Sequence, residues 1–239
     1  MTPGLTAVGV GPGDPELITL RGVRAIREAD VIIAPKAVED SDSIAGRIVA
    51  EYIDLDCQEL IEQVYPMRLD QQGLATFWSQ AAKEVAALVE QGKRVVFVTL
   101  GDPMLYSTFL YLQQYLWELA PEIPVEIVSG LSSINAAAAL AGMPLALADD
   151  RLAVLPATFE DDRLRQTLQD FDTVVLMKVG RVFARVRALL TELGLKEQAV
   201  YVRQVGLTGQ QVFDDLDLVG EADRHYLSMI IVRKTSKEL

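Results

Sequence analysis

Short apolar runs rich in β-branched residues recur along the whole chain, and they alternate with segments whose apolar residues have the period of a helix. This alternation predicts a wound α/β fold. The predicted strands lie at residues 5–10, 30–34, 94–100, 124–128, 152–155, 173–178 and 199–203. The predicted helices lie at residues 20–29, 41–52, 71–91, 104–119, 131–141, 160–170 and 181–193.

The last third of the chain has a different organisation. A turn at Thr208 and Gly209 and the later run HYLSMIIVRK predict antiparallel strands that close a mixed sheet. Two prolines, Pro121 and Pro124, follow a long predicted helix. We therefore expect a domain boundary near residues 120–128, with domains 1–123 and 124–239 and no flexible Ser/Gly linker between them.

The composition excludes several classes of protein. The 239 residues include 22 Lys and Arg against 34 Asp and Glu, a formal net charge of −12. An acidic chain argues against nonspecific binding to nucleic acid or to anionic membranes, because both require clustered cations. No apolar run reaches the roughly 18 residues that span a bilayer, and the N-terminus lacks a signal-peptide pattern. The expected compartment is the cytoplasm.

Cysteine and histidine each occur once, as Cys57 and His225. One cysteine forms no intramolecular disulfide, which agrees with a cytoplasmic chain. The two counts together exclude a zinc site of the usual Cys and His type, and they argue against Ser-His-Asp and Cys-His catalysis. We expect no resident metal ion.

The first candidate ligand loop is VGVGPGDPELITL, residues 8–20. It has closely spaced glycines, but Asp14 and Pro15 stand where a dinucleotide or phosphate loop has its last glycine or its lysine. A carboxylate at this place repels a triphosphate. The alternative is a plain strand-to-helix turn in which Asp14 caps and Pro15 begins a helical turn.

The second candidate is TLGDPMLYSTFLYL, residues 99–112, which repeats the word Gly-Asp-Pro after an apolar strand. Ligands bind at the carboxyl ends of strands in open α/β sheets, so two such words suggest one shared site. A carboxylate beside glycine suits a ribose diol or a ligand cation better than a phosphate. Helix capping by Asp102 is the alternative, although it leaves Tyr106 and Ser107 unexplained.

The third candidate is IVSGLSSINAAAALAGMPL, residues 127–145, a strand followed by a glycine-serine turn and an alanine-rich helix. Small residues allow close approach of a ligand, and the first N–H groups of a helix bind anions. Ser132 and Ser133 are equally explained as helix caps. The conjunction of the three stretches is what favours a ligand site.

Four segments together resemble the tetrapyrrole (corrin and porphyrin) methylases in order and spacing: VGVGPGDPELITLRGVRAIREADVIIAP, TLGDPMLYSTFLYL, SGLSSINAAAALAGMPL and VVLMKVG. The resemblance covers nearly the whole chain. It implies two αβα domains with S-adenosylmethionine (SAM) in a cleft between them, and commonly a homodimer. GDPMLYSTF, IEQVYPM and the length are most similar to the branch that methylates C20 of precorrin-2 or cobalt-factor II in cobalamin biosynthesis.

The resemblance also implies site residues. The cofactor contacts carried over in this way are Pro12, Gly101, Asp102, Pro103, Tyr106, Ser132, Ser133, Ala157 and Met177. Of these, Met177 would contact the adenosine, and the backbone around Ala157 would read the adenine. Asp102 is also the one candidate for a base that removes a proton after methyl transfer, although cofactor binding is the role we expect for it. The product of the cofactor is S-adenosylhomocysteine.

A tetrapyrrole of this pathway carries many carboxylates, so an acidic enzyme needs a local basic trough. The available basic residues are Arg21, Arg24, Lys36, Arg68, Lys178, Arg181 and Arg185. A solvated helix face is the commoner role for each of them.

Other functions compete with this one. Another methylase of the family would act at a different ring position, on uroporphyrinogen III or on a later corrin intermediate. A more distant one would modify ribosomal RNA or a diphthamide precursor, and the acidic balance weighs against RNA. A nucleotide-binding domain is disfavoured by the missing phosphate-loop residues, whereas a noncatalytic SAM sensor is excluded only by an activity test.

Overall fold

A computed structural model describes residues 2–36, 38, 40–65 and 71–234 of the chain. The chain divides into two compact units, Met1–Ser132 and Ser133–Leu239. Each unit has its own five-stranded sheet and its own hydrophobic core. Within the described residues, no helix is both long and apolar enough to cross a membrane.

The sheet of the first unit is entirely parallel, with the strand order β3-β2-β4-β1-β5. All six residues of β1 are buried, as expected for a central strand that is covered on both faces. The strands are β1 (Gly4–Gly9), β2 (Val31–Lys36), β3 (Glu59–Val64), β4 (Arg94–Thr99) and β5 (Val125–Val128).

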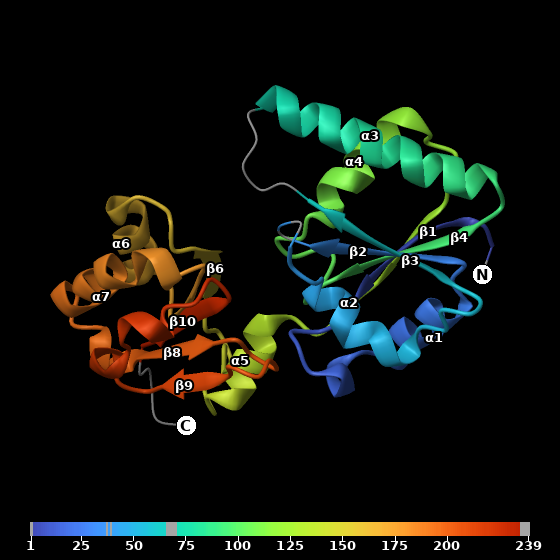
Figure 1. Ribbon diagram of the computed structural model, residues 1–239. Coiled ribbons are helices and arrows are strands. Elements are labelled where there is room, and N and C mark those ends of the chain that lie inside the picture. The colour runs from blue at the N-terminus through green and yellow to red at the C-terminus, as the bar shows by residue number, and fades with distance from the viewer. Residues whose placement is uncertain (1, 37, 39, 66–70, 235–239) are drawn as a thin grey trace. The chain divides into compact units, whose positions relative to one another are not determined.

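Two pairs of helices cover opposite faces of this sheet (Figure 1). Alternate strand residues point to opposite sides, so Val8 packs toward α1 and α2 whereas Ala7 and Phe97 pack toward α3 and α4. The helices are α1 (Leu20–Glu28), α2 (Ile44–Val49), α3 (Gln71–Glu90) and α4 (Phe109–Leu119), and the short 3₁₀ turns are η1 (Pro15–Leu17) and η2 (Ala50–Tyr52).

The sheet of the second unit is mixed, with the strand order β6-β7-β10-β8-β9. Only β6 and β7 pair in parallel, while β10 runs antiparallel to both β7 and β8. The carboxyl ends of β6, β7 and β8 therefore lie at the same edge. The strands are β6 (Leu152–Pro156), β7 (Thr173–Met177), β8 (Ala199–Arg203), β9 (Gln211–Phe213) and β10 (Ser228–Arg233).

The two faces of the second sheet are covered unequally (Figure 1). The helices α6 (Asp161–Asp170) and α7 (Phe183–Glu192) cover one face, which holds the larger core cluster. The short helix α5 (Ser133–Leu140) packs on the other face. The 3₁₀ turns of this unit are η3 (Gly180–Val182), η4 (Lys196–Gln198), η5 (Leu216–Leu218) and η6 (Glu221–Asp223).

The predicted α/β class, with a helix layer on each face of two sheets, is confirmed. So is the antiparallel closing of the second sheet by the last strands. One strand was missed: β3 is an edge strand whose residues are only partly buried, so it lacks the apolar run of the inner strands. The helix expected from residue 104 begins instead at Phe109.

The division between the units falls after Ser132, whereas the prolines suggested a boundary after residue 123. The segment in question contains β5, which pairs with β1 along residues 125–128. Because strand pairing fixes which sheet a segment belongs to, these residues form part of the first unit.

Candidate functional site

The first sheet has a topological switch point between β1 and β4. These two strands are neighbours, yet β1 leads into α1 on one face and β4 leads into α4 on the other. The chain therefore leaves these adjacent strand ends toward opposite faces, and such a switch point is where ligands bind in open α/β sheets. Both Gly-Asp-Pro words follow these two strands.

Three glycines meet where β1, β4 and β5 end. A Cβ atom on Gly9 would lie 2.6 Å from the carbonyl oxygen of Gly101 and 2.6 Å from the amide nitrogen of Gly130. A Cβ atom on Gly130 would lie 2.5 Å from the carbonyl carbon of Gly9. No side chain fits at these distances, so the close approach of the three backbones requires glycine.

The loops after β1 and β4 are joined by a small antiparallel bridge. The Gly101 N–H donates to Gly11 O at 2.7 Å, and both residues have left-handed backbone, with φ of +73° and +80°. A Cβ atom on Gly101 would meet no atom within 4 Å, although the residue itself is buried. Open space beside a buried glycine, with buried Pro12 and Pro103 next to it, fits a ligand that lies against the backbone.

Both carboxylate oxygens of Asp102 are engaged within the first unit. Oδ2 accepts the N–H of Gly130 at 3.0 Å, and Oδ1 accepts the N–H of Met104 at 2.8 Å. Asp102 thus ties the loop after β4 to the loop after β5, and it does not cap a helix. A proton acceptor whose two oxygens already hold backbone amides is poorly suited to act as a base.

The segment between Asp102 and α4 forms turns that place three apolar side chains at the surface. Met104, Leu105 and Tyr106 are 52%, 37% and 46% exposed, and Tyr106 has a left-handed φ of 53°. Beneath them, buried Ser107 and Thr99 share a hydrogen bond of 2.9 Å, and Ser107 Oγ accepts the N–H of Phe109. Ser107 therefore anchors the loop, which explains its place one residue after Tyr106.

The loop after β1 contains the strand-to-helix turn at Asp14 and Pro15 that is the alternative to a ligand loop. Asp14 accepts the N–H of Glu16 at 2.9 Å and caps η1, with Pro15 at its first position. This capping role is confirmed. It does not exclude a ligand, because the glycines that precede Asp14 are the ones that reach Gly101.

The two serines of the third candidate lie at the end of the first unit and the start of the second. Ser132 follows Gly130 by two residues, so it belongs to the same edge of the first sheet. Ser133 is the first residue of α5. Two loops of the first unit are directly hydrogen-bonded to each other, and they carry the candidates Pro12, Gly101, Asp102 and Pro103. The second unit contains the candidates Ser133, Ala157 and Met177.

Ala157 and Met177 lie together at the edge of the second sheet where β6 and β7 end. The N–H of Ala157 donates to Met177 O at 2.7 Å, and Arg185 Nη2 donates to Ala157 O at 2.7 Å and to Phe159 O at 3.0 Å. Ala157 is fully buried with both backbone groups engaged, whereas Met177 is partly exposed. Met177 is thus the more accessible of the two.

Two of the candidate basic residues have other partners. Arg185 holds the carbonyls after β6 and pairs with Asp161 at 3.1 Å, so sequence reasoning missed its structural role. Arg21 pairs with Glu126 at 2.6 Å. Arg68 lies outside the described residues.

His225 lies in the segment before β10, and its imidazole makes a local hydrogen bond. The Nδ1 atom of His225 accepts the N–H of Leu227 at 3.0 Å, and its backbone packs against Gly180. Cys57 is exposed in a turn of the first unit. Within the part of the chain that the structure describes, neither side chain is hydrogen-bonded to a residue that could activate it as a nucleophile.

These features define a two-unit α/β protein whose first sheet has a glycine-built edge at its switch point. Residues 4–218 match the family model of the Tetrapyrrole (Corrin/Porphyrin) Methylases. The chain belongs to this family, and the predicted enzyme class, a methylase, is confirmed.

Two curated relatives match over nearly the full length of both chains. The "Cobalt-precorrin-2 C(20)-methyltransferase" of Salmonella typhimurium (strain LT2) is 40% identical over 232 residues, which cover 96% of this chain and 96% of the relative. The "Precorrin-2 C(20)-methyltransferase" of a Sinorhizobium species is 33% identical over 237 residues, 95% of this chain and 94% of the relative.

Among solved structures, a cobalt precorrin-4 methyltransferase of cobalamin biosynthesis has the same fold. Its TM-score is 0.73 with 23% sequence identity, and the match covers 96% of this chain and 94% of that one.

Proposed function

We propose that this protein is a SAM-dependent methyltransferase that adds one methyl group to C20 of precorrin-2, or of its cobalt complex, in cobalamin biosynthesis. The observation that carries the proposal is the full-length similarity to two curated relatives named for this reaction. The glycine-built edge at the switch point supports it independently, because there is open space beside the buried Gly101 and neither Gly-Asp-Pro loop contains a lysine that could bind phosphate.

The proposed cofactor contacts are those that the resemblance to the family implies. In the first unit these are Pro12, Gly101, Asp102, Pro103, Tyr106 and Ser132, and in the second they are Ser133, Ala157 and Met177. When bound, SAM supplies a methyl group that its sulfonium already activates. A carboxylate and glycine backbone suit the cationic methionine end and the ribose diol of this molecule, and they suit a triphosphate poorly.

The chain's own contribution would be alignment and the exclusion of water. The bridge between Gly11 and Gly101 fixes two loops at the first sheet, and the Asp102 carboxylate fixes the third. At the second sheet, Arg185 holds the backbone beside Ala157, so the partly exposed Met177 keeps a fixed place. We assign Asp102 to this scaffold and not to proton removal, since both of its oxygens hold amides.

A cytoplasmic homodimer is part of the proposal. The single cysteine supports a reducing compartment, and the resemblance to the family supports the dimer.

The test of the reaction is an anaerobic incubation of the purified protein with methyl-labelled SAM and, in parallel, uroporphyrinogen III, precorrin-2 and cobalt-factor II. The mass of each tetrapyrrole is followed over time. We expect a gain of one methyl group on precorrin-2 or on cobalt-factor II, which also decides between the metal-free and the cobalt substrate. A methyl group gained only by uroporphyrinogen III would show that the proposed substrate is wrong.

The residue roles have a separate test. Calorimetric titration of SAM against Asp102→Asn is expected to show weaker binding by about tenfold, because one amide of the scaffold loses its acceptor. The pH profile of kcat is expected to keep its shape in this variant, as it would for a positioning residue. A profile that loses one limb would show that Asp102 transfers the proton.

A further inference from the structure

Most arginines of the second unit have a carboxylate partner, as Arg233 has in Asp150 at 2.9 Å. Among the described residues of this unit, three arginines have none, namely Arg163, Arg181 and Arg224. They lie in segments that follow β6, follow β7 and precede β10. Because β10 runs antiparallel to β7, these segments meet one edge of the sheet, where β6 and β7 end, and we refer to it as the carboxyl edge. The arginines without an ion pair therefore collect at the carboxyl edge.

Arg224 is half-buried, whereas the other two arginines are exposed. Its guanidinium carbon lies 5.3 Å from the centre of the Phe183 ring, and its Nε atom is buried with no hydrogen-bond partner among the described residues. The neighbouring carboxylate is engaged elsewhere, because Asp223 Oδ1 lies 3.1 Å from Arg203 Nη1 and Oδ2 accepts the N–H of Gly220 at 3.0 Å. Withdrawing a cation from water costs free energy unless it is paired, so this arginine indicates an anionic ligand.

A lysine occupies a strained backbone position at the same edge. Lys178 is the first residue after β7, and its φ of +59° lies in the left-handed region that favours glycine. A Cβ atom on Gly180, two residues later, would overlap His225 O and lie 3.3 Å from the carbonyl carbon of Arg224. The turn after β7 therefore touches the segment that carries Arg224. Backbone strain in a residue other than glycine is typical of functional positions, and here the side chain is a cation.

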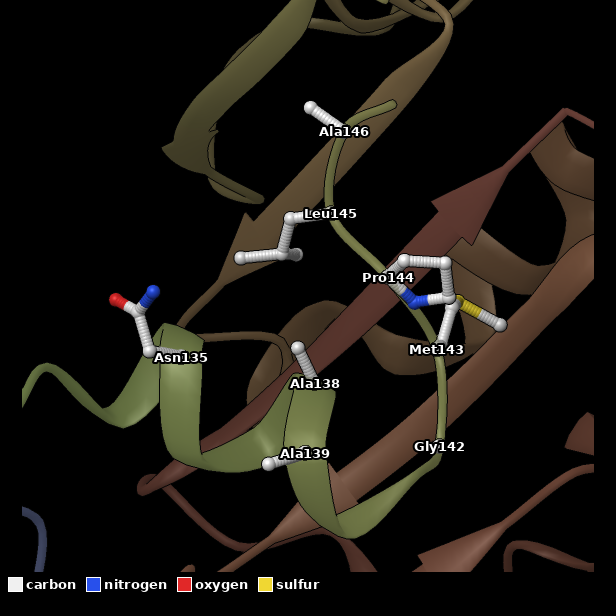
Figure 2. A pocket seen from close by; sticks show the side chains of 8 residues that line it. All are labelled: Asn135, Ala138, Ala139, Gly142, Met143, Pro144, Leu145 and Ala146. Carbon is white, nitrogen blue, oxygen red and sulfur yellow. The ribbon is translucent and has the colours of Figure 1, made fainter. Parts of the chain in front are cut away.

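The hollow beside α5 is unsuited to an anion. Figure 2 shows the residues that line it, and Asn135 has the one polar side chain among them. A carboxylate would find no counter-charge in this lining, and moving it there from water would be costly. On a chain of net charge −12, an anionic ligand needs a local group of cations. In the second unit, Lys178 and Arg224 supply such a group at the carboxyl edge.

We propose that Arg224 and Lys178 bind carboxylates of the tetrapyrrole substrate at the carboxyl edge of the second sheet. The inference rests on the proposed function, since the substrate proposed there carries many carboxylates. SAM is a poorer match for two cations, because it has two positive groups and one carboxylate. A guanidinium that lies over an aromatic ring presents a fork of donors that fits a carboxylate, and a lysine adds a point charge. A ligand with several carboxylates reaches both residues without contact between their side chains.

Substrate binding without turnover tests the proposal. Precorrin-2 and cobalt-factor II are each equilibrated anaerobically with the full chain and S-adenosylhomocysteine, and the bound fraction is measured by ultrafiltration. Arg224→Gln is expected to weaken tetrapyrrole binding about tenfold. Lys178→Gly should weaken it about threefold, and the turn stays unstrained because glycine readily adopts φ +59°. Arg151→Gln is the matched control and should leave binding unchanged, because Arg151 also lies over a ring, 5.8 Å from the centre of Phe171, but at the opposite edge, where β6 begins.

Two further measurements separate the possible outcomes. Circular dichroism shows that each variant is folded, and calorimetric titration of SAM is expected to give the wild-type affinity in both Arg224→Gln and Lys178→Gly. Unchanged tetrapyrrole binding in these two variants would overturn the inference and leave the proposed function standing. A loss of SAM affinity in their place would overturn it as well, because the cations would then contact the cofactor. A wild type that binds neither tetrapyrrole would contradict the proposed function itself.

Discussion

The two sheets differ in how their edges at the candidate site residues are built. In the first unit, the edge is made by backbone: three glycines approach so closely that no Cβ fits, and one carboxylate holds two amides. In the second unit, the edge is held by side chains, with Arg185 on two carbonyls and Tyr201 on the segment before β10. Where backbones are packed this closely, replacing one of the glycines forces the strand ends apart. Where side chains hold the edge, replacing one of them removes only the hydrogen bonds that it makes.

The largest effect is expected from Gly130→Ala. Its Cβ would overlap the Gly9 backbone, so the three strand ends must move apart at a cost of about 3 kcal/mol. Both tryptophans, Trp78 and Trp117, lie in the first unit, so fluorescence-detected urea unfolding reports on it. The control is Gly92→Ala in the same unit, at φ +80° with open space around it, which should cost about 1 kcal/mol. Equal costs would contradict a backbone-built edge.

A smaller effect is expected from Tyr201→Phe in the second unit. The buried hydroxyl donates to Asp223 O at 2.8 Å and accepts from the N–H of His225 at 3.3 Å. Its removal leaves two backbone groups without this partner and should cost about 1.5 kcal/mol. Circular dichroism should register the loss while tryptophan fluorescence stays unchanged. An equal shift in both signals would show that the two units unfold as one.

The ion pair at the opposite edge of the first sheet gives a pH-dependent effect. Asp30 accepts Arg94 Nη2 at 2.7 Å and the Arg94 backbone N–H at 2.8 Å, and these bonds hold the pKa of the Asp30 carboxyl well below its usual value. Its folded pKa is depressed, so the stabilisation is present above the unfolded pKa of about 4 and declines as the pH falls below it.

Asp30→Asn should therefore cost about 1 kcal/mol at neutral pH, and less in acid. Urea unfolding of wild type and variant at pH 7 and at about pH 3 measures the difference. A cost that grows on acidification would show the opposite sign of linkage.

The smallest effect is expected from Asp14→Ala. The carboxylate caps only the short turn η1, through the N–H of Glu16, so its loss should cost about 0.5 kcal/mol. Calorimetric titration of SAM should give nearly the wild-type affinity, because the ligand edge is formed by the glycines before Asp14. A large loss of affinity would instead place Asp14 among the cofactor contacts.

The same contrast explains what the sequence could reveal. Inner strands such as β1 and β4 are continuous apolar runs, and the two Gly-Asp-Pro words mark their ends, so the fold class and the meeting of these two loops at one edge were predictable. The close contact of Gly130 with Gly9 was not, because it joins residues from strands far apart in the chain. The strand β3 was missed because it lies at the edge of the sheet. Its residues are only partly buried, so its sequence is not a continuous apolar run.

The hydrogen bonds made by side chains were the hardest features to predict from the sequence. Asp102 looked like a helix cap or a base, and only the fold brings its second oxygen to Gly130, 28 residues away. Arg185 looked like a candidate for substrate carboxylates, whereas it holds carbonyls 26 and 28 residues earlier in the chain. A charged residue on a helix face has many possible partners, and tertiary contact alone selects one.

The position of the transferred methyl group tests the central claim most directly. The protein is incubated anaerobically with SAM carrying a ¹³C-labelled methyl group and with the tetrapyrrole that gains mass, and the product is examined by NMR. The proposed reaction predicts the label on C20 and on no other carbon. A label at another ring position would contradict the assigned reaction while leaving the family and the fold intact.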